Sequence, residues 1–427
     1  MVAAELSTAA GLRYGALGLP LAFVALPLYV NLPAFYAQQY GVPLATLGLL
    51  LLVSRALDAL ADPFIGWASD RWLQAGKGRT LGLMSLAAGV LALAFGALFM
   101  PPTLSRAALL AWCALMLMLA YLAYSVLSVM HQAWGARLGG SALQQTRLNA
   151  WREGLALAGV VGASVLPSLA GWPATSSVLA LALAAALALL ARAPHAPDTQ
   201  AVAAPRVDPW LPWQLPGFRR LLPVFLLNGV AAAVPATLLL FFVRDRLQTP
   251  QAEPLYLGLY FLSAACSMPL WLRAVARWGQ ARSWALGMLL ALACFAWAAV
   301  LGTGAQLGFA AICIGSGAAL GADLSIPGAM LTRVLQNADL SGRAEGAFFG
   351  WWQLCSKLNL ALAAGLALPL LGLLGYAPGQ RDPQALQALA LAYCVLPCVL
   401  KAAALALLYL LWIRQAPTAL ALKEQTS

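Results

Sequence analysis

The chain has 427 residues, of which 62% are hydrophobic and only 9% are charged. Soluble domains carry roughly 25% charged residues, so the composition excludes an ordinary soluble fold and indicates a polytopic membrane protein. The 25 Lys and Arg residues outnumber the 14 Asp and Glu residues, which gives a formal net charge of +11.

Apolar windows of about 20 residues, the length that crosses a bilayer as a helix, recur along the whole chain. They predict an all-α membrane protein with twelve transmembrane helices, at residues 13–37, 43–69, 81–100, 106–131, 152–171, 174–193, 220–243, 255–275, 283–303, 306–332, 346–372 and 387–412.

The longest break between spans covers residues 194–218 and is rich in Pro and Ala. It predicts a cytoplasmic linker between two six-helix halves, residues 1–193 and 219–427. Two pseudosymmetric halves joined by short loops are typical of secondary transporters, whose solute path lies between the halves.

The basic residues predict the orientation of the chain. With both termini in the cytoplasm, eighteen of the lysines and arginines fall in cytoplasmic segments and four on the opposite side. Cytoplasmic loops are enriched in Lys and Arg, so we expect cytoplasmic termini in a multi-pass bacterial inner or plasma membrane protein. The net charge is thereby explained without nucleic-acid binding.

The second span carries three charges, Arg55, Asp58 and Asp62, in an otherwise apolar run. Their spacing places them on one helix face. Because each charge costs roughly 2.5 to 3.5 kcal/mol at a bilayer centre, such residues usually face a protein interior and carry function. Two carboxylates one turn apart favour uptake of a proton or cation, which predicts a cation-sized polar site.

Other polar and aromatic residues inside the spans are candidates for solute contacts. Lys357 in the eleventh span is a charge partner for the carboxylates, and Asp323 is either a solute ligand or the ion-pair partner of Lys401 or Lys357. His131 is interpreted as a packed histidine, with a proton relay as the alternative. The candidate solute-binding residues, which suit an uncharged hydrogen-bonding solute, are Tyr29, Asn31, Tyr124, Ser128, Arg152, Asp323, Trp351 and Trp352.

The run from Arg55 to Arg71, RALDALADPFIGWASDR, resembles the helix-2 signature of the glycoside-pentoside-hexuronide:cation symporters, the melibiose-permease branch of the major facilitator superfamily. Three further stretches agree with this family: Tyr14-Gly15, the segment from Arg147 to Arg152, and Gly342 to Gly346 leading to Lys357.

The resemblance implies the major facilitator fold and a role for each matching residue. Asp58 and Asp62 would coordinate Na+, Li+ or H+, with Arg55 and Lys357 as their charge partners. Arg152 would line the sugar path. The cytoplasmic gate would consist of Asp70, Arg71, Lys77, Arg79, Arg343 and Glu345.

The chain departs from the sugar-binding members at two positions. Those members carry acids in helices 1 and 4, where Pro20 and Ser128 stand here. The absence of both acids weakens the case for a melibiose-like solute, and the same branch includes carriers of lysolipids. Arg333 and Gln336 also replace acids that are common after span 10.

The expected function is therefore secondary active transport. We expect Na+- or H+-coupled symport of a sugar, glycoside or similar small polar solute by alternating access. The alternative is cation-coupled transport of an amphiphilic or lysolipid-like solute. No catalytic residues, no metal beyond a possible Na+ and no cofactor other than the coupling ion are expected. Two histidines without metal-ligand spacing argue against a membrane-embedded enzyme, and the protein is expected to work as a monomer.

Overall fold

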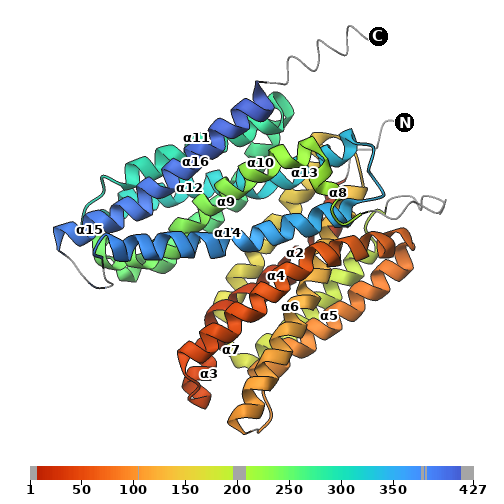
Figure 1. Ribbon diagram of the computed structural model, residues 1–427, viewed down its shortest axis with the longest axis horizontal. Coiled ribbons are helices and arrows are strands. Elements are labelled where there is room, and N and C mark those ends of the chain that lie inside the picture. Colours follow the sequence, from red (N-terminus) through yellow and green to blue (C-terminus); the bar gives the residue numbers. More distant parts are fainter. Residues whose placement is uncertain (1–6, 104, 196–207, 377–378, 380–381, 415–427) are drawn as a thin grey trace. The chain divides into compact units, whose positions relative to one another are not determined.

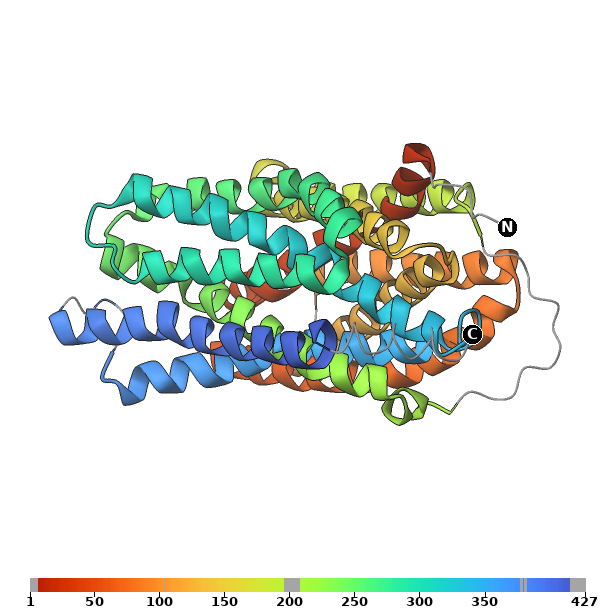
Figure 2. The same ribbon diagram turned by 90° about the horizontal axis from the view of Figure 1, so that it is seen from above.

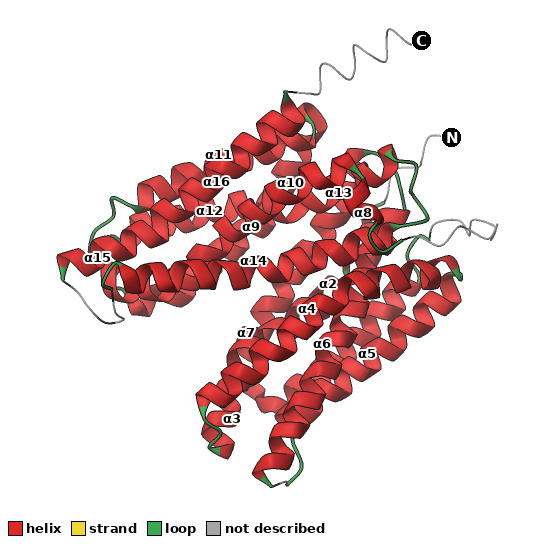
Figure 3. Cartoon of the chain, in the orientation of Figure 1, coloured by secondary structure: helices red, strands yellow, loops and turns green. Residues whose placement is uncertain are grey.

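The computed structural model describes residues 7–103, 105–195, 208–376, 379 and 382–414. Within these ranges every regular element is a helix and no strand is present (Figure 3). The all-α class predicted from the apolar windows is therefore confirmed.

The first predicted span is a series of short helical pieces. These are α1 (Thr8–Gly15), α2 (Gly18–Leu26), the π-helical turn η1 (Pro27–Asn31) and α3 (Leu32–Tyr40). Proline lacks a backbone N–H and cannot continue the regular hydrogen-bond ladder, so Pro27 marks the place where the α-helix widens into a π turn. This turn carries Tyr29 and Asn31.

The next four helices are long (Figure 1). Of these, α4 runs unbroken past Pro63. Within α7, Gly171 has φ 74° and ψ 176°, so this element is two spans joined at a break. The four helices are α4 (Leu44–Gln74), α5 (Lys77–Phe99), α6 (Arg106–Arg137) and α7 (Ala142–Ala191).

The remaining elements repeat this pattern of long helices with short irregular turns. They are α8 (Leu211–Gln214), α9 (Pro216–Phe241), η2 (Phe242–Leu247), η3 (Pro250–Ala252), α10 (Glu253–Trp278), α11 (Gln280–Ala298), α12 (Gln306–Ser325), α13 (Pro327–Asn337), α14 (Glu345–Leu373), α15 (Pro383–Ala390), η4 (Leu391–Val395), α16 (Leu396–Leu408) and η5 (Tyr409–Ile413).

Ten helical stretches in the described part of the chain are long and apolar enough to cross a membrane. This number counts α7 once, although Gly171 divides it into two spans. It also leaves out α4, whose 31 residues include the three charges of the second span as well as Asp70 and Arg71. With α4 added and α7 divided, the twelve predicted spans are accounted for.

The helices pack into two compact units. The N-terminal unit consists of residues 1–212 together with 332–354, and the C-terminal unit of residues 213–331 together with 355–427. Within the N-terminal unit α2 lies against α7, α4 against α6, and α5 against both α6 and α7 (Figure 1 and Figure 2). The segment 332–354 includes the first turns of α14, which pack on α4.

Glycines allow the first turns of α14 to lie directly on α4. A Cβ atom on Gly66 would lie 2.8 Å from the Cα of Gly350 and would also collide with the carbonyl oxygen of Gly346. Small residues permit this backbone-to-backbone approach of helices within membranes. The glycine contact places the Asp70 carboxylate, near the end of α4, beside the N-terminus of α14.

The C-terminal unit has an aromatic core of its own. Phe242 stacks on Tyr393 with 4.1 Å between ring centroids and an interplanar angle of 15°. Tyr256 meets Phe309 edge to face at 4.8 Å, and all four rings are buried. Aromatic pairs in these geometries add to the packing energy of the bundle.

Candidate ion and solute site

The three charges of α4 lie where their spacing predicts. Asp58 and Asp62 are 1% and 0% exposed, and Arg55 is partly buried one turn before Asp58. Ser125 of α6 donates a hydrogen bond to Asp58, with 2.7 Å between Oγ and Oδ1. A carboxylate held out of water in this way requires compensation from donors or positive charge.

Arg55 lies against an aromatic pair. Its guanidinium carbon is 3.7 Å from the centroid of the Tyr29 ring, within the range of a cation–π interaction. Tyr29 stacks in turn on Tyr121 of α6 at 6.2 Å. Arg55 is also close enough to Asp58 and Asp62 to interact electrostatically with both. Asn31, at the end of the same π turn, is half-buried.

The polar residues of α6 form one stripe along the helix. Tyr121, Ser125, Ser128 and Gln132 are spaced three or four residues apart and therefore share a face. Tyr124 lies beside this stripe and is close enough to Arg55, Asp58 and Asp62 to interact electrostatically with them. The stripe connects the carboxylates of α4 with the polar contacts described next.

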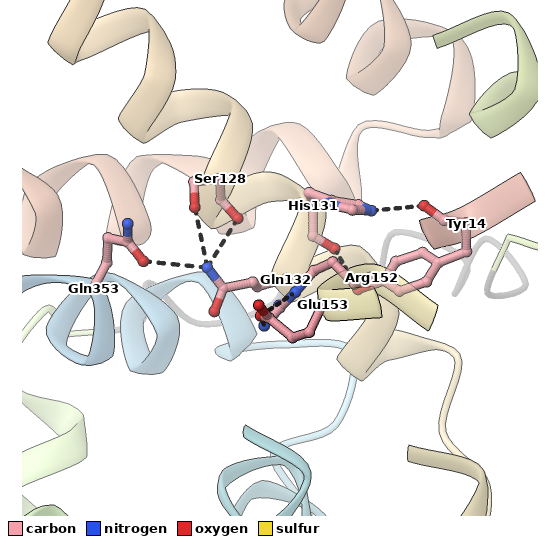
Figure 4. A network of polar contacts seen from close by, with 7 residues as sticks. All are labelled: Tyr14, Ser128, His131, Gln132, Arg152, Glu153 and Gln353. Carbon is pink, nitrogen blue, oxygen red and sulfur yellow. Dashed lines mark hydrogen bonds and ion pairs between the residues drawn. The ribbon is translucent and has the colours of Figure 1, made fainter. Parts of the chain in front are cut away.

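Gln132 is at the centre of a small amide network (Figure 4). Its Nε2 donates to the backbone oxygen of Ser128 at 3.3 Å, to the Ser128 hydroxyl at 3.2 Å and to Oε1 of Gln353 at 3.2 Å. Sequence reasoning found Ser128 but missed both glutamines. Each is a polar amide side chain inside an apolar span, and this position could have indicated a functional role.

Arg152 and Glu153 of α7 form an ion pair. Nε of Arg152 lies 3.0 Å from Oε1 of Glu153, and Nη2 binds the same oxygen. Beside them Tyr14 and His131 exchange two hydrogen bonds (Figure 4). The Tyr14 hydroxyl donates to the His131 backbone oxygen at 3.1 Å, and His131 Nε2 lies 2.8 Å from the Tyr14 oxygen. Because that acceptor is a carbonyl, Nε2 carries the proton, as expected for a packed histidine.

Asp70 caps the N-terminus of α14. Its Oδ1 accepts from the backbone N–H of Gly346 at 2.7 Å, and its Oδ2 accepts from Ala347 at 2.9 Å. A carboxylate at a helix N-terminus satisfies amides that have no intrahelical partner and complements the positive end of the helix dipole. Glu345 accepts from the N–H of Gly342 in the preceding turn.

The other predicted gate residues lie elsewhere. Arg71 and Arg79 are exposed, and the guanidinium of Arg71 lies 4.4 Å from the Trp67 ring centroid. Lys77 donates to the backbone oxygen of Ala193 at 3.2 Å, beyond the end of α7.

The turn before α14 is held partly by residues that the sequence did not single out. Arg343 is exposed, and its backbone oxygen accepts from Nε2 of Gln74 at 3.2 Å. Arg137 donates to the Gly342 oxygen at 3.1 Å. In the sequence, only the position of Arg137 at the end of a span could have indicated this role.

Asp323 belongs to a buried ion pair of the C-terminal unit. Lys401 Nζ lies 2.9 Å from its Oδ2, and Trp284 Nε1 donates to its Oδ1 at 2.8 Å. The alternative in which Lys401 is the partner of Asp323 is therefore the one that the structure shows. Lys357 is buried in the part of α14 that belongs to the same unit.

The two candidate tryptophans are placed differently. Trp351 packs on Trp210 with 5.0 Å between ring centroids, and its Nε1 donates to the Pro209 oxygen at 2.9 Å. It therefore contacts the segment just before α8. Trp352 is 5% exposed within α14.

The sequence of the chain matches known transport proteins. Residues 11–195 and 214–415 match the family described as MFS/sugar transport protein. A stretch of 140 residues is 33% identical to the inner membrane symporter YicJ of Escherichia coli (strain K12). This match covers 31% of the chain and 28% of the relative, so the chain spans less than a third of that relative's length.

The fold is shared with solved transporters. The chain resembles a bacterial homologue of the iron transporter ferroportin in the outward-facing state, with a TM-score of 0.67, 17% identity, and coverage of 95% of this chain and 99% of that one. It also resembles FucP, a major facilitator superfamily transporter in the outward conformation, with a TM-score of 0.59, 15% identity, and coverage of 94% and 99%. These likenesses confirm the major facilitator fold, and with the match over nearly the whole sequence they establish that the chain belongs to the MFS/sugar transport protein family.

Proposed function

We propose that the protein couples entry of Na+ or H+ to transport of a sugar, glycoside or similar small polar solute by alternating access, with both termini in the cytoplasm. Membership of the family supports secondary transport. The observation that carries the coupling is the pair of buried carboxylates, Asp58 and Asp62, on one face of α4, with Ser125 donating to the first.

The charges of α4 favour reversible binding of a cation. Two buried carboxylates one turn apart repel each other, and the single charge of Arg55 offsets only one of them. A proton or Na+ on Asp58 and Asp62 removes the remaining negative charge and lowers the cost of keeping this region dry. A ligand shifts a conformational equilibrium only if it binds one of the two states more tightly. Because the bound cation lowers the cost of the dry state, it would bind that state more tightly.

The contacts of Asp70 with the N-terminus of α14 would act as the cytoplasmic gate. In this scheme the bonds from Gly346 and Ala347 to Asp70 form when the cytoplasmic side is closed and break when it opens. Glu345 and Arg137 fix the turn that leads into this junction.

The coupling is tested in proteoliposomes with Na+ and pH gradients imposed separately, using solutes found in a screen of sugars, glycosides and lysolipids. Asp62→Asn is expected to exchange solute across the membrane but not to accumulate it against a gradient. Asp339→Asn is the control, because Asp339 is exposed and its φ of 53° suits Asn. Accumulation by Asp62→Asn equal to that of wild type contradicts the proposal.

A second candidate function is cation-coupled transport of an amphiphilic or lysolipid-like solute. It is favoured by Ser128, which stands where sugar-binding members carry an acid and is buried against Gln132. Transport of lysolipid with no transport of sugars in the same screen would replace the first candidate with this one.

A further inference from the structure

Three buried groups of the N-terminal unit that can donate hydrogen bonds have no acceptor among the described residues. They are Nη1 of Arg55, the hydroxyl of Tyr121 and Nη1 of Arg152. Buried polar atoms are almost always paired, and an unpaired donor on a charged group is especially costly. Three such donors in one region would stabilise a bound acceptor.

The three donors belong to one cluster. Arg55 packs on Tyr29, and Tyr29 stacks on Tyr121. Tyr124, one turn along α6 from Tyr121, is close enough to Arg55 to interact electrostatically with it. Arg152 in turn interacts electrostatically with Tyr124. The aromatic residues of α6 and η1 thus connect the two guanidinium groups.

Two carboxylate oxygens beside these donors already accept hydrogen bonds. Oε1 of Glu153 accepts from two nitrogens of Arg152, which leaves the third nitrogen unpaired. Oδ1 of Asp58 accepts from Ser125. Two of the three unpaired donors sit on guanidinium groups. The acceptor that satisfies them best is an oxyanion, because hydrogen bonds from Arg to carboxylate or phosphate are charge-assisted.

We infer that the transported solute carries an anionic oxygen group, a carboxylate or a phosphate, which Arg55, Tyr121 and Arg152 bind. This inference rests on the proposed transport function and narrows its solute from an uncharged molecule to an anion. Two sources share this chemistry: a sugar acid and the head group of a lysophospholipid.

The charge balance sets an order of binding. Arg55 and Arg152 face three carboxylates, those of Asp58, Asp62 and Glu153. A cation or proton on the α4 pair leaves this set neutral, so the anion then enters without net repulsion. By linkage, the cation raises the affinity for the anion by the same factor as the anion raises the affinity for the cation. The same charges thus account for both binding and coupling.

The inference is tested by ligand stabilisation of the detergent-solubilised protein, which needs no ion gradient. Thermal unfolding midpoints are measured against increasing probe, because a ligand that binds the folded state raises the midpoint according to its affinity. The probes form two matched pairs: glucuronate with glucose, and lysophosphatidate with the monoacylglycerol of the same acyl chain. In at least one pair the anionic member is expected to bind about tenfold or more tightly than its neutral partner, as a charge-assisted hydrogen bond predicts.

Variants test which residues cause the preference for the anionic probe. Arg152→Gln alone leaves the half-buried Glu153 without its ion-pair partner, so the double variant Arg152→Gln/Glu153→Gln is used to keep the pair neutral. This variant and Arg55→Gln are expected to reduce the preference for the anion about tenfold. Tyr121→Phe is expected to reduce it less. Arg106→Gln is the control, because Arg106 is an exposed arginine on the same helix as Tyr121.

Equal binding within both pairs, a preference for the neutral members, or no saturable effect of either anionic probe overturns the inference. So does an unchanged preference in both arginine variants. These results leave cation coupling intact, because that is judged by accumulation in Asp62→Asn. Which pair shows the preference decides between a sugar acid and a lipid head group.

Discussion

Ser125 on α6 donates a hydrogen bond to Asp58 on α4, and both side chains are 1% exposed or less. The bond joins two helices at the level of the candidate cation site. The Ser125 hydroxyl compensates part of the cost of burying the Asp58 charge, and a bound cation would supply the same compensation.

Replacing Ser125 with Ala removes this donor. Without this donor the buried charge gains more from a bound cation. A hydrogen bond to a charged group contributes roughly 1.5 to 3 kcal/mol, so the half-saturating concentration of the coupling ion is expected to fall roughly 10- to 100-fold. The measurement is cation-dependent uptake in proteoliposomes. Ser164→Ala is the matched control, because Ser164 is exposed on α7 and its hydroxyl donates only to a backbone oxygen. A weaker apparent affinity for the ion would show that Ser125 itself helps to bind it.

Asp70→Asn tests the cap on α14. Asn retains a single acceptor oxygen and no charge, so it satisfies at most one of the two amides that Asp70 binds. Hydrogen–deuterium exchange at Gly346 and Ala347 is expected to become roughly 10- to 100-fold faster, which corresponds to about 1.5 to 3 kcal/mol. Asp339→Asn, in the nearby turn, should leave both amides protected. Unchanged protection in Asp70→Asn contradicts the capping role.

The fold and the shared helix face of Arg55, Asp58 and Asp62 were predictable because each depends on local periodicity. A helix needs about 20 apolar residues to cross a membrane, and charges three and four residues apart share a face wherever the helix lies. The residues that contact these three charges were not predictable in this way. Whether Ser125 or Tyr124 points at Asp58 depends on the rotation of α6 against α4, which no local pattern determines.

Lys77 illustrates the same limit at the predicted gate. Its place in a basic turn after α4 indicated a gate residue, but its side chain reaches the backbone oxygen of Ala193. A long flexible side chain can bind any carbonyl within reach. The motif therefore predicts where the backbone of the turn lies, but it does not predict which group the Lys77 ammonium contacts. Asp70 is short and rigid, and its binding to α14 follows more directly from its position.

Gly66→Ala tests the close approach of α4 and α14. The new Cβ would meet backbone atoms of Gly346 and Gly350, which cannot move aside as a flexible side chain can. Overpacking of this kind costs about 1 to 3 kcal/mol, so we expect a lower unfolding midpoint and slower transport. The midpoint is measured by thermal unfolding in detergent.

Gly48→Ala is the control on the same helix. A Cβ on Gly48 would meet no atom within 4 Å, and Ala is favoured over Gly in a helix by about 1 kcal/mol. This variant should therefore be as stable as the wild type or more so. Equal stability of Gly66→Ala and wild type would mean that the two helices have room to separate at this point.

Asp323 and Lys401 of the C-terminal unit are expected to stabilise the fold only when both charges are present. Lys401→Met leaves the buried carboxylate with only the Trp284 donor, and breaking a buried ion pair costs about 3 to 5 kcal/mol. The double variant Asp323→Asn/Lys401→Met removes both charges and keeps an oxygen that Trp284 can bind. Its unfolding midpoint should therefore recover most of the loss. If the double variant is as unstable as the sum of the two single variants, the charges contribute separately, and Asp323 then acts outside its pairing with Lys401.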